Sequence, residues 1–404
     1  MRWSKMKYKG MGRWMYLMRL TAFILFLTGS FLAGGTTAVR AESLLPKEQQ
    51  ETDYTEEFID ILDMGAVEEY LASHEETENL SFYELVSGIA GGEIPINGKS
   101  ITDSVVSLLW KEIRANKDIL ILVLLLAVSC SFVKNFADVF RNTYISDICF
   151  VIIYLEMIAL LMKSFLIMNE IVTGSMEKIV EFMSMLIPVF CMSLSIGMAD
   201  ITAAGFYEIA FLVIYIVQWV MLAFLLPMVQ IFIVTEFMNY MIPGEKFTRM
   251  CELLESAVKW CLKFAVTVIV GLNVVQGIMA PAIDRLKMSG VTKTIGMIPG
   301  VGNAVNVLSE MMLGAGMVIK GSVGTAGIVI LLVIFLVPFS KMLVLSLLYK
   351  VTAAVSEPIA DKRISGSINS VYTGCVLLQK IMLTSLALFL LTIAMIMASS
   401  NFIM

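Results

Sequence analysis

Long apolar runs separated by short polar segments fill the last three-quarters of the chain. An α-helix rises about 1.5 Å per residue, so about 20 apolar residues cross a hydrocarbon layer of about 30 Å. The runs that meet or approach this length are 119–133, 148–168, 182–198, 206–234, 264–280, 327–348 and 381–399. We therefore predict an all-α fold, a polytopic transmembrane helical bundle with about seven spans over residues 119–404.

The path of the chain through the membrane is open after the fourth run. That run is long and contains Pro227, so it fits either one kinked helix or a tight hairpin. Positive charge marks cytoplasmic loops, but the segments 243–263, 282–326 and 349–380 carry four Lys or Arg each. The side of the C-terminus therefore stays undecided.

Two connecting regions differ from ordinary loops. Residues 245–263 mix apolar and charged positions as a helix lying in the membrane interface does. The segment 289–327 is rich in glycine, which suits either close helix packing or a re-entrant element.

The N-terminal 41 residues have the anatomy of a signal peptide. A basic stretch precedes an apolar core at 20–32, and Val39-Arg40-Ala41 supplies small residues for cleavage after Ala41. The alternative is a retained membrane anchor. Cleavage or retention would both place residues 42–118 outside the cytoplasm.

Residues 42–118 form an acidic segment, with fifteen acids and two lysines between residues 42 and 100. Acidic and apolar residues alternate at helical spacing, which predicts a small helical ectodomain. Ser81 and Glu84 have the spacing of a capping box, and Gly91-Gly92 ends the short helix that this box opens.

Composition excludes several classes of protein. Hydrophobic residues make up 58% and charged residues 16% of the chain, with a mean hydropathy of +0.84, so a soluble fold is excluded. The soluble part offers no basic face for nucleic acid. Because His74 is the single histidine and the six cysteines lie in or beside apolar runs, we predict no metal, no cofactor and no His-dependent catalysis.

A glycine-rich stretch, 92–100, looks like a phosphate-binding loop. It has five residues between its glycines where the motif requires four, so we interpret it as a surface turn. No HExxH zinc signature is present either. An intramembrane enzyme is therefore the weakest of the functional classes.

Charged residues inside spans are costly and usually face a bundle interior or an aqueous path. Glu156 and Lys163 share one face of the second run, two turns apart. This spacing fits a buried structural pair, or partners on a neighbouring helix, or a conduction or proton path. Lys341 follows Pro338 in the sixth run, and a proline leaves backbone carbonyls unpaired that an ammonium group could contact. The alternative is that the Lys341 side chain extends to the membrane interface.

Uncharged polar residues add further candidates. Asn273 and Gln276 share a face of the fifth run and suit hydrogen bonding between helices. Asn303, Asn306 and Glu310 form a polar stripe that would line a lumen in a re-entrant segment, or face water in an interfacial helix.

Two stretches carry a resemblance to a known family. The first comprises Ile298-Pro299, Gly302, Lys320-Gly321 and Gly324; the second comprises Pro338, Lys341, Leu343, Leu345, Tyr349-Lys350, Ala353-Ala354 and Pro358. With the order of signal, acidic segment and spans, they resemble the stage III sporulation protein AE family of endospore-forming bacteria. The family has no agreed catalytic residues to transfer.

The resemblance implies a role and partners. It implies a multi-pass protein of the mother-cell membrane around the forespore, acting as a non-enzymatic core or gate of a sporulation channel complex akin to secretion systems. Its partners would be the ATPase, small membrane subunits and ring protein of the same operon, together with forespore protein Q and the lipid bilayer. A homo-oligomer is compatible with this role. The alternative function is a self-sufficient secondary transporter that binds substrate or protons near the midplane through Glu156, Lys163 and Lys341.

Overall fold

The computed structural model describes residues 59–74, 76–78, 80–92, 143–197, 201–242, 244, 246–295 and 302–399, with parts of 110–132. They belong to one compact unit, Glu51–Met404. Only the backbone is described at 143–147, 149–150, 194–197, 201–208, 273, 276–295, 302–313 and 398–399. Every regular element in this described part is helical, which confirms the all-α prediction. The signal peptide, with Ala41, lies outside the described residues, and so do residues 119–120, 126, 130–131 and 133 of the first predicted run.

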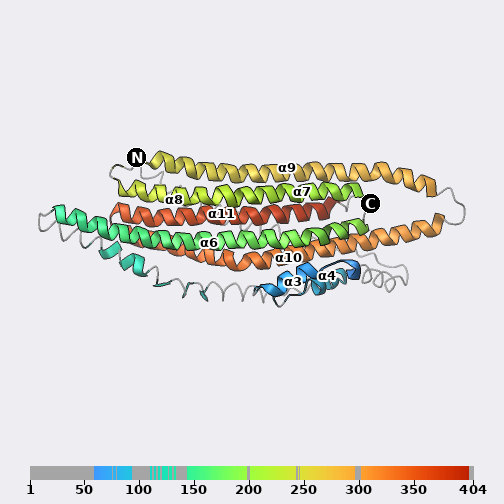
Figure 1. Cartoon of the computed structure of the whole chain (residues 1–404), viewed down its shortest axis with the longest axis horizontal. Helices are drawn as coiled ribbons and strands as arrows, with labels where there is room; N and C mark the ends of the chain where they lie inside the picture. Colours follow the sequence, from blue (N-terminus) through green and yellow to red (C-terminus); the bar gives the residue numbers. More distant parts are fainter. Residues whose placement is uncertain are drawn as a thin grey trace. The chain divides into compact units, whose positions relative to one another are not determined.

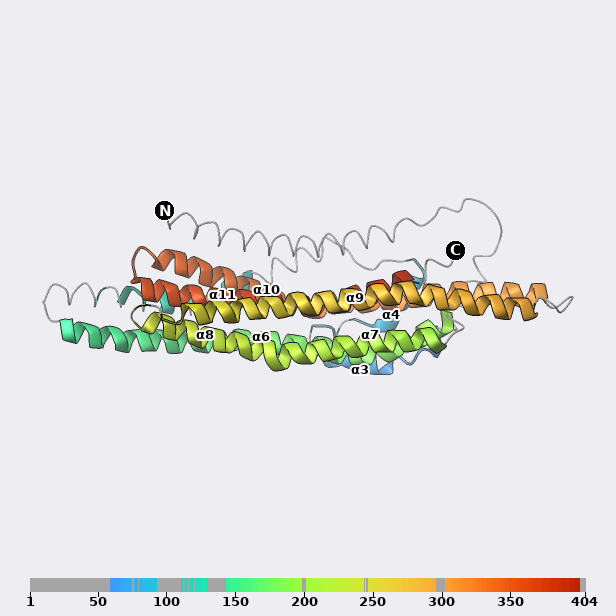
Figure 2. The same cartoon turned by 90° about the horizontal axis from the view of Figure 1, so that it is seen from above.

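Five long helical segments run side by side (Figures 1 and 2). They are α6 (Thr143–Gly197), the continuous series α7 (Ile201–Val220), η1 (Met221–Leu225) and α8 (Leu226–Met241), then α9 (Thr248–Ile295), α10 (Gly302–Ser356) and α11 (Lys362–Ser399). Two short helices, α3 (Gly65–Ser73) and α4 (Phe82–Ala90), precede them. Short connections make consecutive long helices antiparallel.

Helix α11 is the centre of the bundle. It packs against α6, α7, α8, α9 and α10, and side chains on all its sides are buried, including Val376, Leu377 and Leu378. A helix that is apolar all round belongs in a core, whereas one that faces water has a polar side. The last predicted span, 381–399, is therefore the C-terminal part of a longer and mainly buried helix.

Two of the predicted spans, 148–168 and 182–198, form one uninterrupted helix, α6. The polar stretch between them, 169–181, contains no proline and one glycine, Gly174, so nothing in it breaks the helix. Polarity alone does not end a helix when the side chains find partners. The polar stretch is instead where α3 docks, as described below.

Four helices of the described residues are long and apolar enough to cross a membrane, judged by length and composition. They are Val151–Ser193, Ile209–Met241, Gly314–Ser356 and Lys362–Met397. The predicted runs 148–168, 182–198, 206–234, 327–348 and 381–399 all lie within or overlap these helices, whereas 264–280 lies in α9. The chain is therefore a multi-pass membrane protein.

The run that contains Pro227 is one long helix and not a hairpin. The π-helix η1 ends two residues before this proline, and α8 begins at Leu226. Proline lacks a backbone N–H and its ring clashes with the carbonyl four residues earlier. A π segment widens the helix at that point and lets it continue.

The two unusual connecting regions are parts of long helices. Residues 248–263, which belong to the segment 245–263 that we expected to lie in the interface, continue without a break into 264–280 as α9. This helix packs on α7, α8 and α11. The glycine-rich segment is divided between the end of α9 and the start of α10.

Glycines of α10 allow a close approach between helices. A Cβ placed on Gly327 would lie 2.6 Å from Leu186 Cδ2 of α6, and one on Gly324 would lie 2.5 Å from Met397 Sδ of α11. A side chain at either position would force its neighbour to shift. This confirms the close-packing interpretation for these two residues.

Candidate functional site: docked helices and buried polar contacts

The short helices α3 and α4 form a small unit with its own hydrogen bonds. The Ser81 hydroxyl accepts from the Glu84 backbone N–H at 3.3 Å and caps α4, which ends at Gly91 and Gly92, as the sequence predicts. Gly92 has a φ of +81°, a conformation that favours glycine. One oxygen of Glu68, on α3, accepts from the Ser81 hydroxyl at 2.9 Å, so the two helices are tied together.

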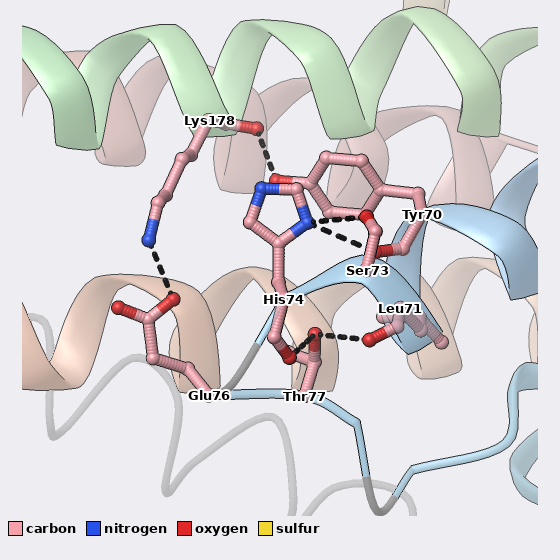
Figure 3. A network of polar contacts seen from close by, with 7 residues as sticks. All are labelled: Tyr70, Leu71, Ser73, His74, Glu76, Thr77 and Lys178. Carbon is pink, nitrogen blue, oxygen red and sulfur yellow. Dashed lines mark hydrogen bonds and ion pairs between the residues drawn. The ribbon is translucent and has the colours of Figure 1, made fainter.

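This unit docks on the polar middle of α6 (Figure 3). The Tyr70 hydroxyl donates to the backbone carbonyl of Lys178 at 2.9 Å, and the Lys178 ammonium forms an ion pair of 2.7 Å with Glu76. The Tyr70 ring also packs against Phe182, with centroids 5.7 Å apart. Helix α4 completes the contact by packing on α10.

The docking contact is partly desolvated. Burial raises the pKa of the Tyr70 phenol above its ordinary value, and the carboxylates of Glu181 and Glu76 add to this effect. The neutral phenol is therefore the form that docks. His74 helps to hold the Tyr70 side chain in place. The centroids of the His74 and Tyr70 rings lie 4.2 Å apart, and His74 Nδ1 lies 2.9 Å from the Tyr70 carbonyl oxygen (Figure 3).

Buried polar contacts connect α11 to its neighbours at successive levels. Ser385 donates to the Gln218 side-chain oxygen of α7 at 2.7 Å, and the Gln218 amide donates to the Ser385 carbonyl at 3.2 Å. The Gln379 amide donates to Ser346 of α10 at 3.2 Å. Such pairs satisfy polar groups where no water is present and fix the register between helices.

Two tyrosines of the same core join other helix pairs. Tyr154 of α6 shares a hydrogen bond of 2.8 Å with Ser367 of α11, and the hydroxyl of Tyr349 of α10 donates to Ser164 of α6. Both tyrosines are almost fully buried. These hydrogen bonds hold α6 to α11 and α10 to α6.

One carboxylate lies near the end of the bundle where α8, α9 and α11 meet. The Ser370 hydroxyl donates to Glu236 of α8 at 3.1 Å. Asn239 holds the connection between α8 and α9, because its side-chain oxygen accepts from the Phe247 N–H at 2.7 Å. Among the described residues no group of acidic, His or Cys side chains is arranged to hold a metal ion.

The structure places the predicted charged residues in different environments. Glu156 and Lys163 are both exposed on the outer face of α6 and not buried in the core of the chain. Lys341 is half-buried in α10. The side chains of Asn273, Gln276, Asn303, Asn306 and Glu310 lie outside the described residues, although their backbones are helical.

The sequence reasoning missed most of the contacts described above. Gln218 and Gln379 carry the same signal as Asn273 and Gln276, an amide within or beside an apolar run, and the same rule would have selected them. Lys178 stands in the polar middle of α6, which looked like a loop. The serine and tyrosine contacts could not be predicted, because these residue types are common in helices and only tertiary packing pairs them.

Some of the residues that carry the family resemblance lie in the core of the bundle, whereas Leu343, Ala354 and Pro358 are exposed. Lys320 and Tyr349 are buried in α10, and Lys350 Nζ lies 5.3 Å from the centre of the Tyr372 ring of α11. Pro338 lies inside α10 without ending it. These positions serve the packing of α10 on its neighbours.

Comparison with known proteins gives one consistent result. The family model described as stage III sporulation protein AE matches residues 80–400. Stage III sporulation protein AE of Bacillus subtilis (strain 168) is 22% identical over 299 residues, which cover 74% of this chain and 75% of the relative. No solved structure matches. The chain therefore belongs to the stage III sporulation protein AE family, whose name states a role in sporulation.

Proposed function

We propose that this chain is a non-enzymatic membrane subunit, the core or gate, of the channel complex that links mother cell and forespore and that spore development requires. Family membership supports the sporulation role. The hydrogen bonds of the described site join neighbouring helices, as a structural subunit requires.

The observation that carries the proposal is the position of Glu156 and Lys163. Both lie within the apolar helix Val151–Ser193, and both are exposed on the surface of the single chain. A charge near the bilayer centre costs about 2.5–3.5 kcal/mol on insertion scales, so such residues normally face protein or water. A self-sufficient transporter keeps these charges inside its own bundle. Charges on the outside suit a subunit whose neighbours cover them.

Helix length gives further support. The described helix Val151–Ser193 of α6 has 43 residues, as does Gly314–Ser356 of α10, or about 65 Å of helix against a hydrocarbon layer of about 30 Å. Both helices therefore extend beyond a single bilayer crossing. In a complex, other subunits contact the part of each helix outside the bilayer.

The proposal assigns the remaining steps to partners. ATP hydrolysis belongs to the operon's ATPase, and assembly involves the small membrane subunits, the ring protein and forespore protein Q. The chain would reside in the mother-cell membrane around the forespore, with residues 42–118 outside the cytoplasm.

Reconstitution of the purified chain tests the proposal against the transporter alternative. We expect vesicles that hold this chain alone to take up no solute in response to an ion gradient. We also expect a strain without the chain to stop spore development after engulfment begins. Gradient-driven uptake by the chain alone would establish a transporter and refute the channel-subunit role.

A further inference from the structure

The exposed side of α6 is a defined surface, which we call the α6 outer face. It consists of Ile152, Leu155, Glu156, Lys163 and Leu166, all exposed. At 3.6 residues per turn these five positions fall on one side of the helix. The opposite side, with Tyr154, Met157, Leu161 and Phe165, is buried against the bundle.

We propose that the α6 outer face binds a transmembrane helix of a different protein, which carries a base level with Glu156 and an acid level with Lys163. The inference rests on the proposed function, because it names the chemistry of a neighbouring subunit. The apolar residues of the face supply close packing, and the two charges supply register and specificity.

The two charges require partners of their own. Seven residues of helix separate them by about 10.5 Å along the axis, far beyond the 4 Å of an ion pair. Ion pairs elsewhere in the described residues, such as Lys178 with Glu76 and Lys259 with Glu255, have N–O distances of 2.7 and 2.8 Å. A helix beside α6 brings an opposite charge to each level at once when its own acid and base are also seven residues apart.

Symmetry argues against a second copy of this chain as the occupant. Copies in one membrane with the same topology are related by an axis along the membrane normal, so equal residues lie at equal depth. When the α6 outer face pairs with itself about a two-fold axis, Glu156 meets Glu156, and Lys163 meets Lys163. Like charges repel in this arrangement, whereas a different helix can place opposite charges at both depths.

Lipid is also a poor occupant. A lysine side chain can extend to the headgroups, but a glutamate side chain is too short to do so from within the span. Ile152 and Leu155 lie next to Glu156 on the same face and are apolar. A protein helix meets both the apolar and the charged parts of the face.

The test uses two synthetic transmembrane peptides and the full chain in phosphatidylcholine vesicles. One peptide is a leucine-rich helix with an arginine and a glutamate seven residues apart near its centre, and the other has leucine at both positions. Energy transfer between labelled chain and labelled peptide measures binding. We expect the charged peptide to bind at least tenfold more tightly than the leucine peptide.

Variants decide whether the α6 outer face is responsible. The double variant Glu156→Gln, Lys163→Met should bind both peptides equally, whereas the control Glu252→Gln, Lys263→Met, which neutralises an exposed acid and base of α9, should keep the preference. Equal binding of the peptides to the unchanged chain, or an undiminished preference in the first variant, overturns the inference. Displacement of the charged peptide by added unlabelled chain also overturns the inference, because a second copy would then occupy the α6 outer face. If the peptides fail while the operon proteins still co-isolate with the chain, this inference is refuted and the proposed function stands.

Discussion

Helix packing around Gly374 of α11 provides the sharpest test of the core. A Cβ at this position would lie 2.8 Å from Ile233 Cγ1 of α8 and 2.9 Å from Phe165 Cε2 of α6. Both neighbours are fully buried and cannot move aside freely. Overpacking of this kind costs about 1–3 kcal/mol, partly offset by up to about 1 kcal/mol because alanine favours helix over glycine.

Gly321→Ala is the matched control. Gly321 also lies inside a long helix, α10, but a Cβ there meets nothing within 4 Å. The helix preference of alanine is common to both variants, so it cancels when they are compared. We therefore expect Gly374→Ala to be less stable than Gly321→Ala by about 1–3 kcal/mol.

Unfolding in mixed micelles with increasing dodecyl sulfate, followed by tryptophan fluorescence, measures this difference. The midpoint for Gly374→Ala should fall below that of the unchanged chain, and the midpoint for Gly321→Ala should stay equal or rise. If Gly374→Ala is as stable as Gly321→Ala, then α11 does not lie between α6 and α8 as described.

Three further predictions concern single contacts. Lys178→Met removes the ion pair with Glu76; this pair is partly exposed and worth about 0.5–1 kcal/mol. Limited proteolysis should therefore cleave the α3 region of the variant about two to five times faster. An unchanged rate would show that the pair does not hold α3. Burial raises the pKa of Tyr70, so the contribution of its neutral hydroxyl to the stability of the α3 contact is complete below pH of about 10 and is lost as the pH rises above that value. Hydrogen exchange in α3 should therefore accelerate above pH 10 by more in the unchanged chain than in Tyr70→Phe. Identical pH profiles of exchange in the two proteins would contradict this prediction. In a double-mutant cycle, Gln218→Leu and Ser385→Ala should show a coupling of about 0.6–1.7 kcal/mol in micelle unfolding, and strict additivity would mean that the two side chains do not interact.

The sequence predicts the class of the fold because membrane helices carry their signal locally. Apolar runs of sufficient length identify the helices, and the capping box at Ser81 locates the start of α4. The same signal cannot tell where a long helix ends. The polar stretch 169–181 looks like a break in α6 only when its partners in the α3 region are unknown. The helix continues past Pro227 because the π-helix η1 widens it just before the proline.

The site was less predictable than the fold. The cost of a buried charge drew attention to Glu156 and Lys163, and the structure places both on the outside of the single chain. That rule says that a charge needs a partner but not whether the partner belongs to the same polypeptide. The contacts around Tyr154, Tyr349 and Ser367 depend on which helices become neighbours, and a periodic pattern in one helix does not contain that information.

Isolation of the affinity-tagged chain from sporulating cells after engulfment tests the central claim most directly. Quantitative mass spectrometry of the detergent-solubilised membranes should recover the operon's ATPase, small membrane subunits and ring protein in fixed ratios to the tagged chain. The Glu156→Gln, Lys163→Met variant, present at the same abundance as the unchanged chain, should recover several times less of these partner proteins. A tagged chain that leaves the membrane alone, at full abundance and with spore development intact, would contradict the account.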